Sequence, residues 1–503
     1  MTVSPRPAPP RDDTLRSGHG LARAAVTGVV WQGLSYLSTK VLALATTVLL
    51  AHLLAPEAFG LVTFSIVFVT YAEVVTELGV AQALIYLPRD RRYQQGALLI
   101  CLAMAVGMAT GVALGAPLIG RFFDRPDIVP MIRVLALYLL VSGSFQVPDA
   151  LLRRGLHFRR RMAVEISRAL AYGVVAVALA LAGRGAWAIV WAYLAGGVAA
   201  STVAWSLVDE RPSLRSWRLH RPVARSLLVY GLPVAGHGFL ASLIFDIDYV
   251  IVGKRLGAEA LGFYMLAFRI PELVIINVFY VLSAVAFPAY SHARQDPDRL
   301  RRGYLFSTQL QTLYGVGAGV GLAMLAPLLV PVIFGARWSA SVAPLQALAL
   351  YAAFRSLGNS STDLNKGTGR PGLALKLAVL RLAVLVPVLL WAASFGINAV
   401  AWAQAGAAFA LALLMQAVTA RTIHVPLRDF AVALRPAVAA GAGIAVGAGL
   451  VRWWLPGGVL VRLAVAVVAA AALGFAAVWA VDRPLVGEIR GLLRRPATAP
   501  AGP

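Results

Sequence analysis

Long apolar segments follow one another along nearly the whole of this chain. About twenty apolar residues, each rising about 1.5 Å along a helix, cross the hydrocarbon core of a bilayer. Of the 503 residues, 59% are hydrophobic and 13% are charged, and the mean hydropathy is +0.76. A soluble protein this apolar would have no polar surface left to face water, so the sequence predicts an integral membrane protein.

About fourteen such segments can be marked, and each is long enough for a membrane-spanning helix. They run over residues 24–54, 57–87, 94–120, 128–152, 162–182, 186–208, 226–256, 258–289, 303–334, 339–365, 372–394, 397–420, 430–452 and 458–481. None has the alternation over about ten residues that is typical of a membrane β-strand. We therefore expect an all-α integral membrane fold.

Lysine and arginine are concentrated in every second loop. When the N-terminus is placed in the cytoplasm, the predicted inner loops hold clusters such as 153–161, whereas the outer turn 52–57 has no lysine or arginine. This alternation follows the positive-inside rule and places both termini in the cytoplasm. Basic inner loops also account for the net charge of +23 without a nucleic-acid partner.

A short repeat indicates two similar halves. LAPEAFG at residues 54–60 matches LGAEALG at 256–262, and LALY at 135–138 matches LALY at 348–351. The matched positions lie six predicted segments apart. This spacing predicts two pseudo-symmetric six-helix bundles related by an axis along the membrane normal, with substrate held between them near the midplane.

The predicted domain organisation follows from the segments and the repeat. It consists of a disordered cytoplasmic tail at 1–22, an N-terminal lobe at 23–208, a cytoplasmic linker at 209–224, a C-terminal lobe at 225–421, two appended transmembrane helices at 422–481 and a second cytoplasmic tail at 482–503. The first tail is rich in proline, arginine and glycine and lacks the apolar core of a signal peptide.

Charged residues lie well inside the two apolar runs on either side of the turn at 253–259. Asp246 and Asp248 precede this turn by about ten residues, and Arg269 and Glu272 follow it by about ten, so all four lie about 15 Å from it on antiparallel neighbours. Ionised groups at this depth cost several kcal/mol unless they pair or face water. Because four charges exceed the needs of one structural pair, we expect them to line a polar cavity.

Other intramembrane charges leave two interpretations open. Lys40 and Glu73 fall near the midplane of the first hairpin, and Glu77 lies one helical turn beyond Glu73 on the same face. They could lock two helices together as a structural ion pair, or they could line the cavity. Arg355 lies about halfway along its segment, before the polar run 358–366, and belongs either to the cavity or to a solvated helix end.

Sequence signatures of enzymes are absent. There is no G-x-x-x-x-G-K-[ST] or H-E-x-x-H motif, and the single Cys101 lies in an apolar run. No predicted outer loop exceeds about a dozen residues, which argues against membrane glycosyltransferases and polymerases with large external catalytic loops. The sequence predicts a transporter, with no catalytic residues, no metal and no cofactor.

The stretch LIFDIDYVIVGKRLGAEALGFYMLAFRIPEL at 243–273, followed by VLSAVAFPAYSHARQDPDRL at 281–300, resembles the polysaccharide flippases, the Wzx-type exporters. These form part of the multidrug/oligosaccharidyl-lipid/polysaccharide exporter (MOP) superfamily. The resemblance covers roughly residues 20–430 and includes LAHLLAPEAFGLVTFSIVF at 50–68.

The resemblance implies a flippase that carries undecaprenyl-diphosphate-linked oligosaccharides across the bacterial cytoplasmic membrane by alternating access. Its partners would be this lipid-linked substrate, membrane lipids, H⁺ or Na⁺ as a coupling ion, and a polymerase and glycosyltransferases of exopolysaccharide, capsule or O-antigen synthesis. Arginine is the best side chain for a diphosphate, so Arg269 is expected to matter most. The alternatives are a peptidoglycan-precursor flippase and a multidrug-type small-molecule antiporter.

Overall fold

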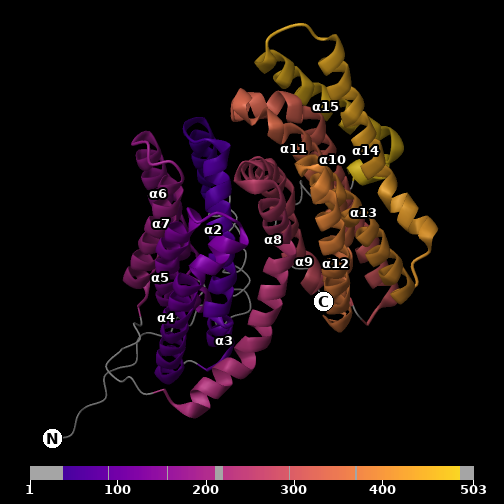
Figure 1. Cartoon of the computed structure of the whole chain (residues 1–503). Helices are drawn as coiled ribbons and strands as arrows, with labels where there is room; N and C mark the ends of the chain where they lie inside the picture. Colours follow the sequence, from indigo (N-terminus) through magenta and orange to yellow (C-terminus); the bar gives the residue numbers. More distant parts are fainter. Residues whose placement is uncertain are drawn as a thin grey trace, which may run out of the picture. The chain divides into compact units, whose positions relative to one another are not determined.

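The computed structural model describes residues 38–88, 90–155, 157–209, 219–293, 295–368 and 371–487 (Figure 1). These parts of the chain are helical and contain no strand. A helix satisfies its own main-chain hydrogen bonds, which a segment surrounded by lipid cannot obtain from water. The predicted N-terminal tail at 1–22, residues 210–218 of the linker and residues 488–503 of the C-terminal tail lie outside the described residues.

The start of the first predicted segment, at 24, lies outside the described residues, and the other helices begin and end close to the predicted segment limits. In chain order they are Ser38–Leu53, α2 (Pro56–Glu77), α3 (Val80–Tyr86), α4 (Arg91–Phe122), α5 (Ile128–Arg154), α6 (Phe158–Leu181), α7 (Ala186–Leu207), α8 (Arg221–Pro271), the π-helix η2 (Glu272–Ile276), α9 (Asn277–Ala293), α10 (Pro297–Ile333), the 3₁₀-helix η3 (Ala336–Ser341), α11 (Val342–Gly367), α12 (Pro371–Ala392), the 3₁₀-helix η4 (Ala393–Phe395), α13 (Ile397–Thr422), α14 (Leu427–Trp454) and α15 (Val459–Val481).

The prediction of fourteen helical segments is confirmed. Eleven spans in the described part of the chain are long and apolar enough to cross a membrane. One of these runs from α8 to α9 and contains two predicted segments, because Gly257 interrupts α8 with a φ of 87°. The remaining two are the shorter apolar helix Ser38–Leu53 and α11, whose polar residues make it less apolar than the eleven spans.

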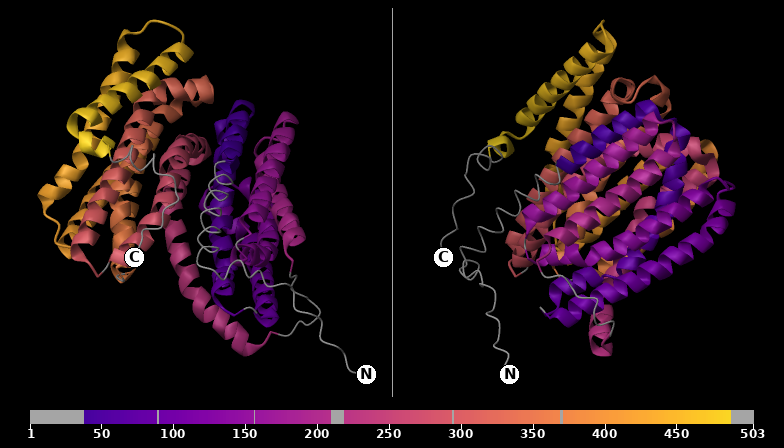
Figure 2. Two further views of the ribbon diagram at one scale, coloured as in Figure 1. Left: turned by 180° about the vertical axis from the view of Figure 1, so that it is seen from behind. Right: turned by 90° about the vertical axis from the view of Figure 1, so that its left-hand side faces the viewer.

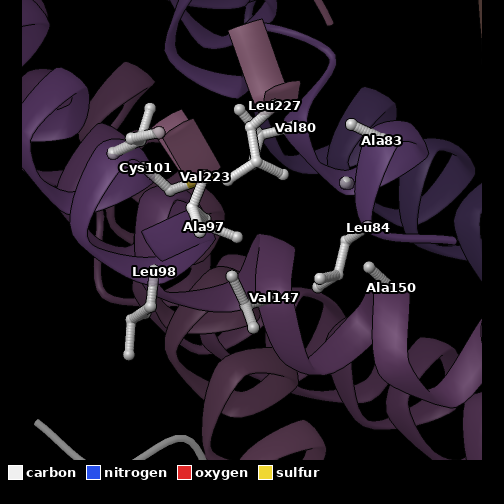
Figure 3. Packing of buried hydrophobic residues seen from close by; sticks show 12 residues of the cluster. Val80, Ala83, Leu84, Ala97, Leu98, Cys101, Val147, Ala150, Val223 and Leu227 are labelled. Carbon is white, nitrogen blue, oxygen red and sulfur yellow. The ribbon is translucent and has the colours of Figure 1, made fainter. Parts of the chain in front are cut away.

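The first of two compact units comprises residues up to 54 and residues 65–243. In it α4 packs against α5, and both α5 and α6 pack against α7. Figure 3 shows a buried cluster of this unit that contains Leu84, Leu98, Val147, Leu227 and Cys101. These side chains come from α3, α4, α5 and the start of α8, so one apolar cluster joins four helices.

Arginine side chains link neighbouring helices at one end of this unit. Arg154, the last residue of α5, donates hydrogen bonds to two carbonyl oxygens near the end of α3, at 2.8 Å from Leu84 and 2.7 Å from Leu87. Buried Asp149 on α5 forms ion pairs with Arg153 at 2.6 Å and with Arg161 on α6 at 3.1 Å. Part of the basic cluster predicted for this inner loop therefore serves to join α3, α5 and α6.

The second unit comprises residues 55–64 and residues from 244 onward. Helix α10 packs against α11, α11 packs against α13, and α14 packs on α10. The appended helices α14 and α15 form an antiparallel pair at the yellow end of the chain in both views of Figure 2. Their backbones approach closely, since a Cβ on Gly443 would lie 2.4 Å from the Leu473 carbonyl oxygen.

Within the second unit, the two copies of the LAPEAFG/LGAEALG repeat contact each other reciprocally. A Cβ on Gly60 would lie 1.7 Å from the Ala258 carbonyl oxygen, and a Cβ on Gly262 would lie 2.0 Å from the Pro56 carbonyl oxygen. Each glycine thus makes room for the main chain of the other copy. The repeat found in the sequence is a packing motif, and its last residue has to be glycine.

This contact generates a stability prediction. Replacing Gly60 with alanine forces two backbones apart, and we expect a loss of about 1–3 kcal/mol, as for overpacked sites. Gly406→Ala is the matched control, because nothing lies within 4 Å of a Cβ there. Thermal unfolding of the purified protein in detergent compares the two. Equal midpoints for both variants would show that the repeat glycine is not required for packing.

Candidate functional site

A buried carboxylate anchors a polar cluster in the second unit. Asp248 on α8 accepts hydrogen bonds from the Tyr264 hydroxyl at 3.0 Å and from Gln404 Nε2 on α13 at 3.3 Å. Tyr264 lies beyond the break at Gly257, so the carboxylate joins both halves of α8 to α13. Asp248 is buried, and these donors offset the cost of removing its charge from water.

Two arginines converge on one tyrosine in the same unit. Arg355 on α11 and Arg381 on α12 both donate to the Tyr351 hydroxyl, at 3.2 and 3.0 Å. The Arg355 guanidinium also lies 4.4 Å from the centroid of the Phe245 ring. Among the described residues neither arginine forms an ion pair. One neutral oxygen cannot use all their N–H donors, so the arrangement suits a ligand with several negative charges.

The four charges predicted around the turn at 253–259 are only partly brought together. Arg269 Nη1 lies 3.2 Å from Glu272 Oε2, and both side chains remain partly exposed. Asp246 is half-buried and interacts electrostatically with Asp248 and Glu272. Arg269 and Glu272 lie three residues apart and therefore on one face of their helix, and Arg269 forms its ion pair there and not with Asp246. The expected cavity role of these residues stays a prediction.

The first unit holds a second polar cluster. Glu73 Oε1 on α2 accepts hydrogen bonds from Ser142 Oγ at 2.6 Å and from the Tyr138 hydroxyl at 3.1 Å, both on α5. These contacts, and not the considered pair with Lys40, are the hydrogen bonds of Glu73 among the described residues. Lys40 is half-buried on the helix Ser38–Leu53. Glu77, the last residue of α2, interacts electrostatically with Arg153.

Sequence reasoning did not single out the cluster residues Tyr138, Tyr351, Tyr264 and Gln404, and it gave Arg381 only as a weaker candidate that could reach the membrane interface. A signal for the two LALY tyrosines and for Arg381 was present in the repeat. Tyr138 and Tyr351 are its last residues, and Arg168 and Arg381 each follow their tyrosine by 30 residues. Extending the repeat past its four-residue core would have found both arginines. Gln404 has no such signal, since an amide in an apolar helix is common.

A metal site is not evident in the described part of the chain, which has no group of three or more histidine, cysteine, aspartate or glutamate side chains that could hold an ion. The clusters instead combine guanidinium groups, phenols and single carboxylates. Such groups can bind phosphate and hydroxyl groups of a ligand without covalent chemistry.

Comparisons with known proteins agree with this arrangement. Residues 49–343 match the family model described as "Polysaccharide biosynthesis protein". The teichuronic acid biosynthesis protein TuaB of Bacillus subtilis (strain 168) is 25% identical over 368 residues, which cover 70% of this chain and 73% of TuaB. The lipopolysaccharide biosynthesis protein WzxC of Escherichia coli (strain K12) is 22% identical over 384 residues, 73% of this chain and 75% of WzxC.

Solved transporter structures share the fold. The lipid II flippase MurJ, in an inward closed conformation, gives a TM-score of 0.69 at 12% identity and covers 91% of this chain and all of its own. An inward-facing multidrug resistance MATE family transporter of the MOP superfamily gives a TM-score of 0.66 at 16% identity and covers 79% of this chain. With these neighbours and relatives, the chain is a multi-pass membrane transporter and not an enzyme, and it belongs to the polysaccharide biosynthesis protein family of Wzx-type flippases.

Proposed function

We propose that this flippase of polysaccharide synthesis carries undecaprenyl-diphosphate-linked oligosaccharide units across the bacterial cytoplasmic membrane. The polymer built from them would be an exopolysaccharide, a capsule or an O-antigen-type chain. Named relatives serve teichuronic acid, lipopolysaccharide and succinoglycan synthesis. The polar head of such a lipid cannot cross hydrocarbon unaided, while its polyprenyl tail cannot leave it, so a helix bundle with internal polar groups suits both parts.

The observation that carries this proposal is the pair Arg355 and Arg381 on the shared Tyr351 hydroxyl. Two positive charges brought together in an apolar bundle repel each other and keep unused N–H donors. A diphosphate supplies at least two negative charges and several acceptor oxygens, which match two planar guanidinium forks. A neutral or cationic drug would leave the repulsion unrelieved, and this favours the lipid diphosphate over the substrate of a multidrug antiporter.

Orientation and driving force complete the proposal. Both termini face the cytoplasm in this scheme, because the basic loops then lie inside. The sequence has no ATP-binding motif. Alternating access would therefore be driven by H⁺ or Na⁺, or by a polymerase that consumes the flipped units which glycosyltransferases assemble on the inner side.

Removing either arginine tests the diphosphate site. We expect Arg355→Ala and Arg381→Ala each to lower polymer export by about tenfold or more, since each loses charge-assisted hydrogen bonds. Lysine at either position keeps the charge without the fork and should retain part of the activity. Polymer output is measured beside protein abundance in cells whose export depends on this chain.

The matched control for these variants is Arg435→Ala, which removes an exposed arginine of the same unit. Normal export from both site variants would refute the diphosphate site. A fall in abundance that accounts for the loss of export would assign both arginines a structural role. Rescue of peptidoglycan synthesis in cells lacking their lipid II flippase would point to the peptidoglycan precursor instead.

The orientation makes a separate prediction. In a Cys101→Ala background, cysteines at Ala55 and Gly457 should react with a membrane-impermeant thiol reagent added outside, because both positions are exposed in predicted outer turns. A cysteine at Arg92, exposed in a predicted inner loop, should react only after the membrane is opened. The opposite pattern at all three positions would mean that the termini lie outside.

A further inference from the structure

One arginine of the first unit has no hydrogen-bond partner among the residues that the structure describes. Arg168 on α6 lies with its guanidinium 4.7 Å from the centroid of the Phe145 ring, and its Nε is buried without an acceptor among the described residues. It also forms no ion pair with the described carboxylates. A guanidinium left unsatisfied in an apolar bundle is costly. A ligand that offers acceptor oxygens would remove this cost.

The repeat explains why Arg168 lacks an acceptor. Arg381, at the equivalent position 30 residues after its LALY tyrosine, donates to the Tyr351 hydroxyl at 3.0 Å. In the first unit the Tyr138 hydroxyl instead donates to Glu73 at 3.1 Å. Glu73 thus replaces Arg168 as the partner of the tyrosine, and the arginine is left with its donors unused.

The surroundings of Arg168 are arranged to hold it in place. Gly196 and Gly197 on α7 face it and Tyr138: a Cβ on Gly197 would lie 2.6 Å from the Tyr138 ring, and one on Gly196 would lie 3.6 Å from Arg168 Cγ. The Tyr138 and Tyr193 rings lie 4.6 Å apart. The glycines therefore leave space that the arginine stem and the tyrosine ring fill.

The charges around Arg168 restrict the class of ligand. Its charged neighbours are Glu165 and Glu73, and Glu165 lies 3.7 Å from Arg161. An anion would be repelled by Glu73 and a cation by Arg168. A hydroxyl group satisfies both, because it can donate to the carboxylate and accept from the guanidinium at once. A sugar ring carries neighbouring hydroxyl groups, and each of them can donate one hydrogen bond and accept another.

We propose that Arg168, Glu73, Tyr138 and Tyr193 form a subsite for a neutral sugar ring of the transported glycan, in addition to the diphosphate site at Arg355 and Arg381. The inference rests on the proposed function, since it assumes that the cargo carries a glycan. It assigns the two units different chemistry: the first recognises hydroxyl groups and the second recognises phosphate.

Binding to two lipids tests the subsite. The probes are the lipid-linked repeat unit extracted from producing cells and undecaprenyl diphosphate without sugar, each titrated into the full-length protein in nanodiscs. We expect Arg168→Lys and Glu73→Gln each to weaken binding of the glycan-bearing lipid about tenfold, the effect of one charge-assisted hydrogen bond. Their binding of undecaprenyl diphosphate should equal that of the wild type.

The control variant is Arg133→Lys, which alters an exposed arginine on α5; it should bind both lipids as the wild type does. Unchanged binding of the glycan-bearing lipid by both site variants, or equal weakening for both lipids, would overturn the subsite. Glu73→Gln decides alone if Arg168→Lys does not fold.

The remaining outcome separates the two proposals. If the wild type binds neither lipid, the proposed function fails, and the oligosaccharide released from the extracted lipid by mild acid becomes the probe. Binding of this free glycan that Arg168→Lys weakens would still support the subsite. No binding of it would overturn the subsite as well.

Discussion

A charge inside an apolar helix bundle has to be hydrogen-bonded or neutralised, and this demand organises the charged side chains described in the second unit. Asp248 meets it fully within the chain, since Tyr264 and Gln404 donate to it and tie both halves of α8 to α13. Arg355 and Arg381 meet it only in part, because they share a single phenol oxygen. The incomplete neutralisation is what makes the arginine pair on Tyr351 suited to a ligand, whereas Asp248 is suited to holding helices together.

The two tyrosines of the LALY repeat take part in opposite chemistry. Tyr351 accepts from two guanidinium groups, while Tyr138 donates to the Glu73 carboxylate. The position four residues after each tyrosine differs accordingly, being Ser142 in one unit and Arg355 in the other. A phenol can donate or accept a hydrogen bond. The same tyrosine can therefore serve beside a carboxylate in one unit and beside guanidinium groups in the other. A duplicated bundle could acquire two kinds of recognition in this way.

The fold was predictable from the sequence to a greater extent than the site. Apolar length and the alternation of basic loops are local properties, and they sufficed for the fourteen helical segments. Which polar side chains hydrogen-bond to each other depends on which helices pack together, and hydropathy does not contain this information. Arg269 lies in the sequence at the same predicted depth as Asp246, yet the ion pair that it forms is with Glu272, three residues along its own helix. Arg168 went unnoticed since its importance lies in the partner that it lacks, although the 30-residue spacing of the repeat contained the clue.

The reciprocal contact at Gly60 and Gly262 has a mechanical consequence. Two main chains in direct contact resist further approach strongly, because repulsion rises steeply below the van der Waals distance, while the dispersion attraction between so few atoms is weak. Such a contact sets a minimum distance between the turn at Pro56 and the turn at Ala258. It prevents the two turns from moving closer together but resists their separation only weakly. A side chain in place of either glycine would act as a spacer that moves this limit outward.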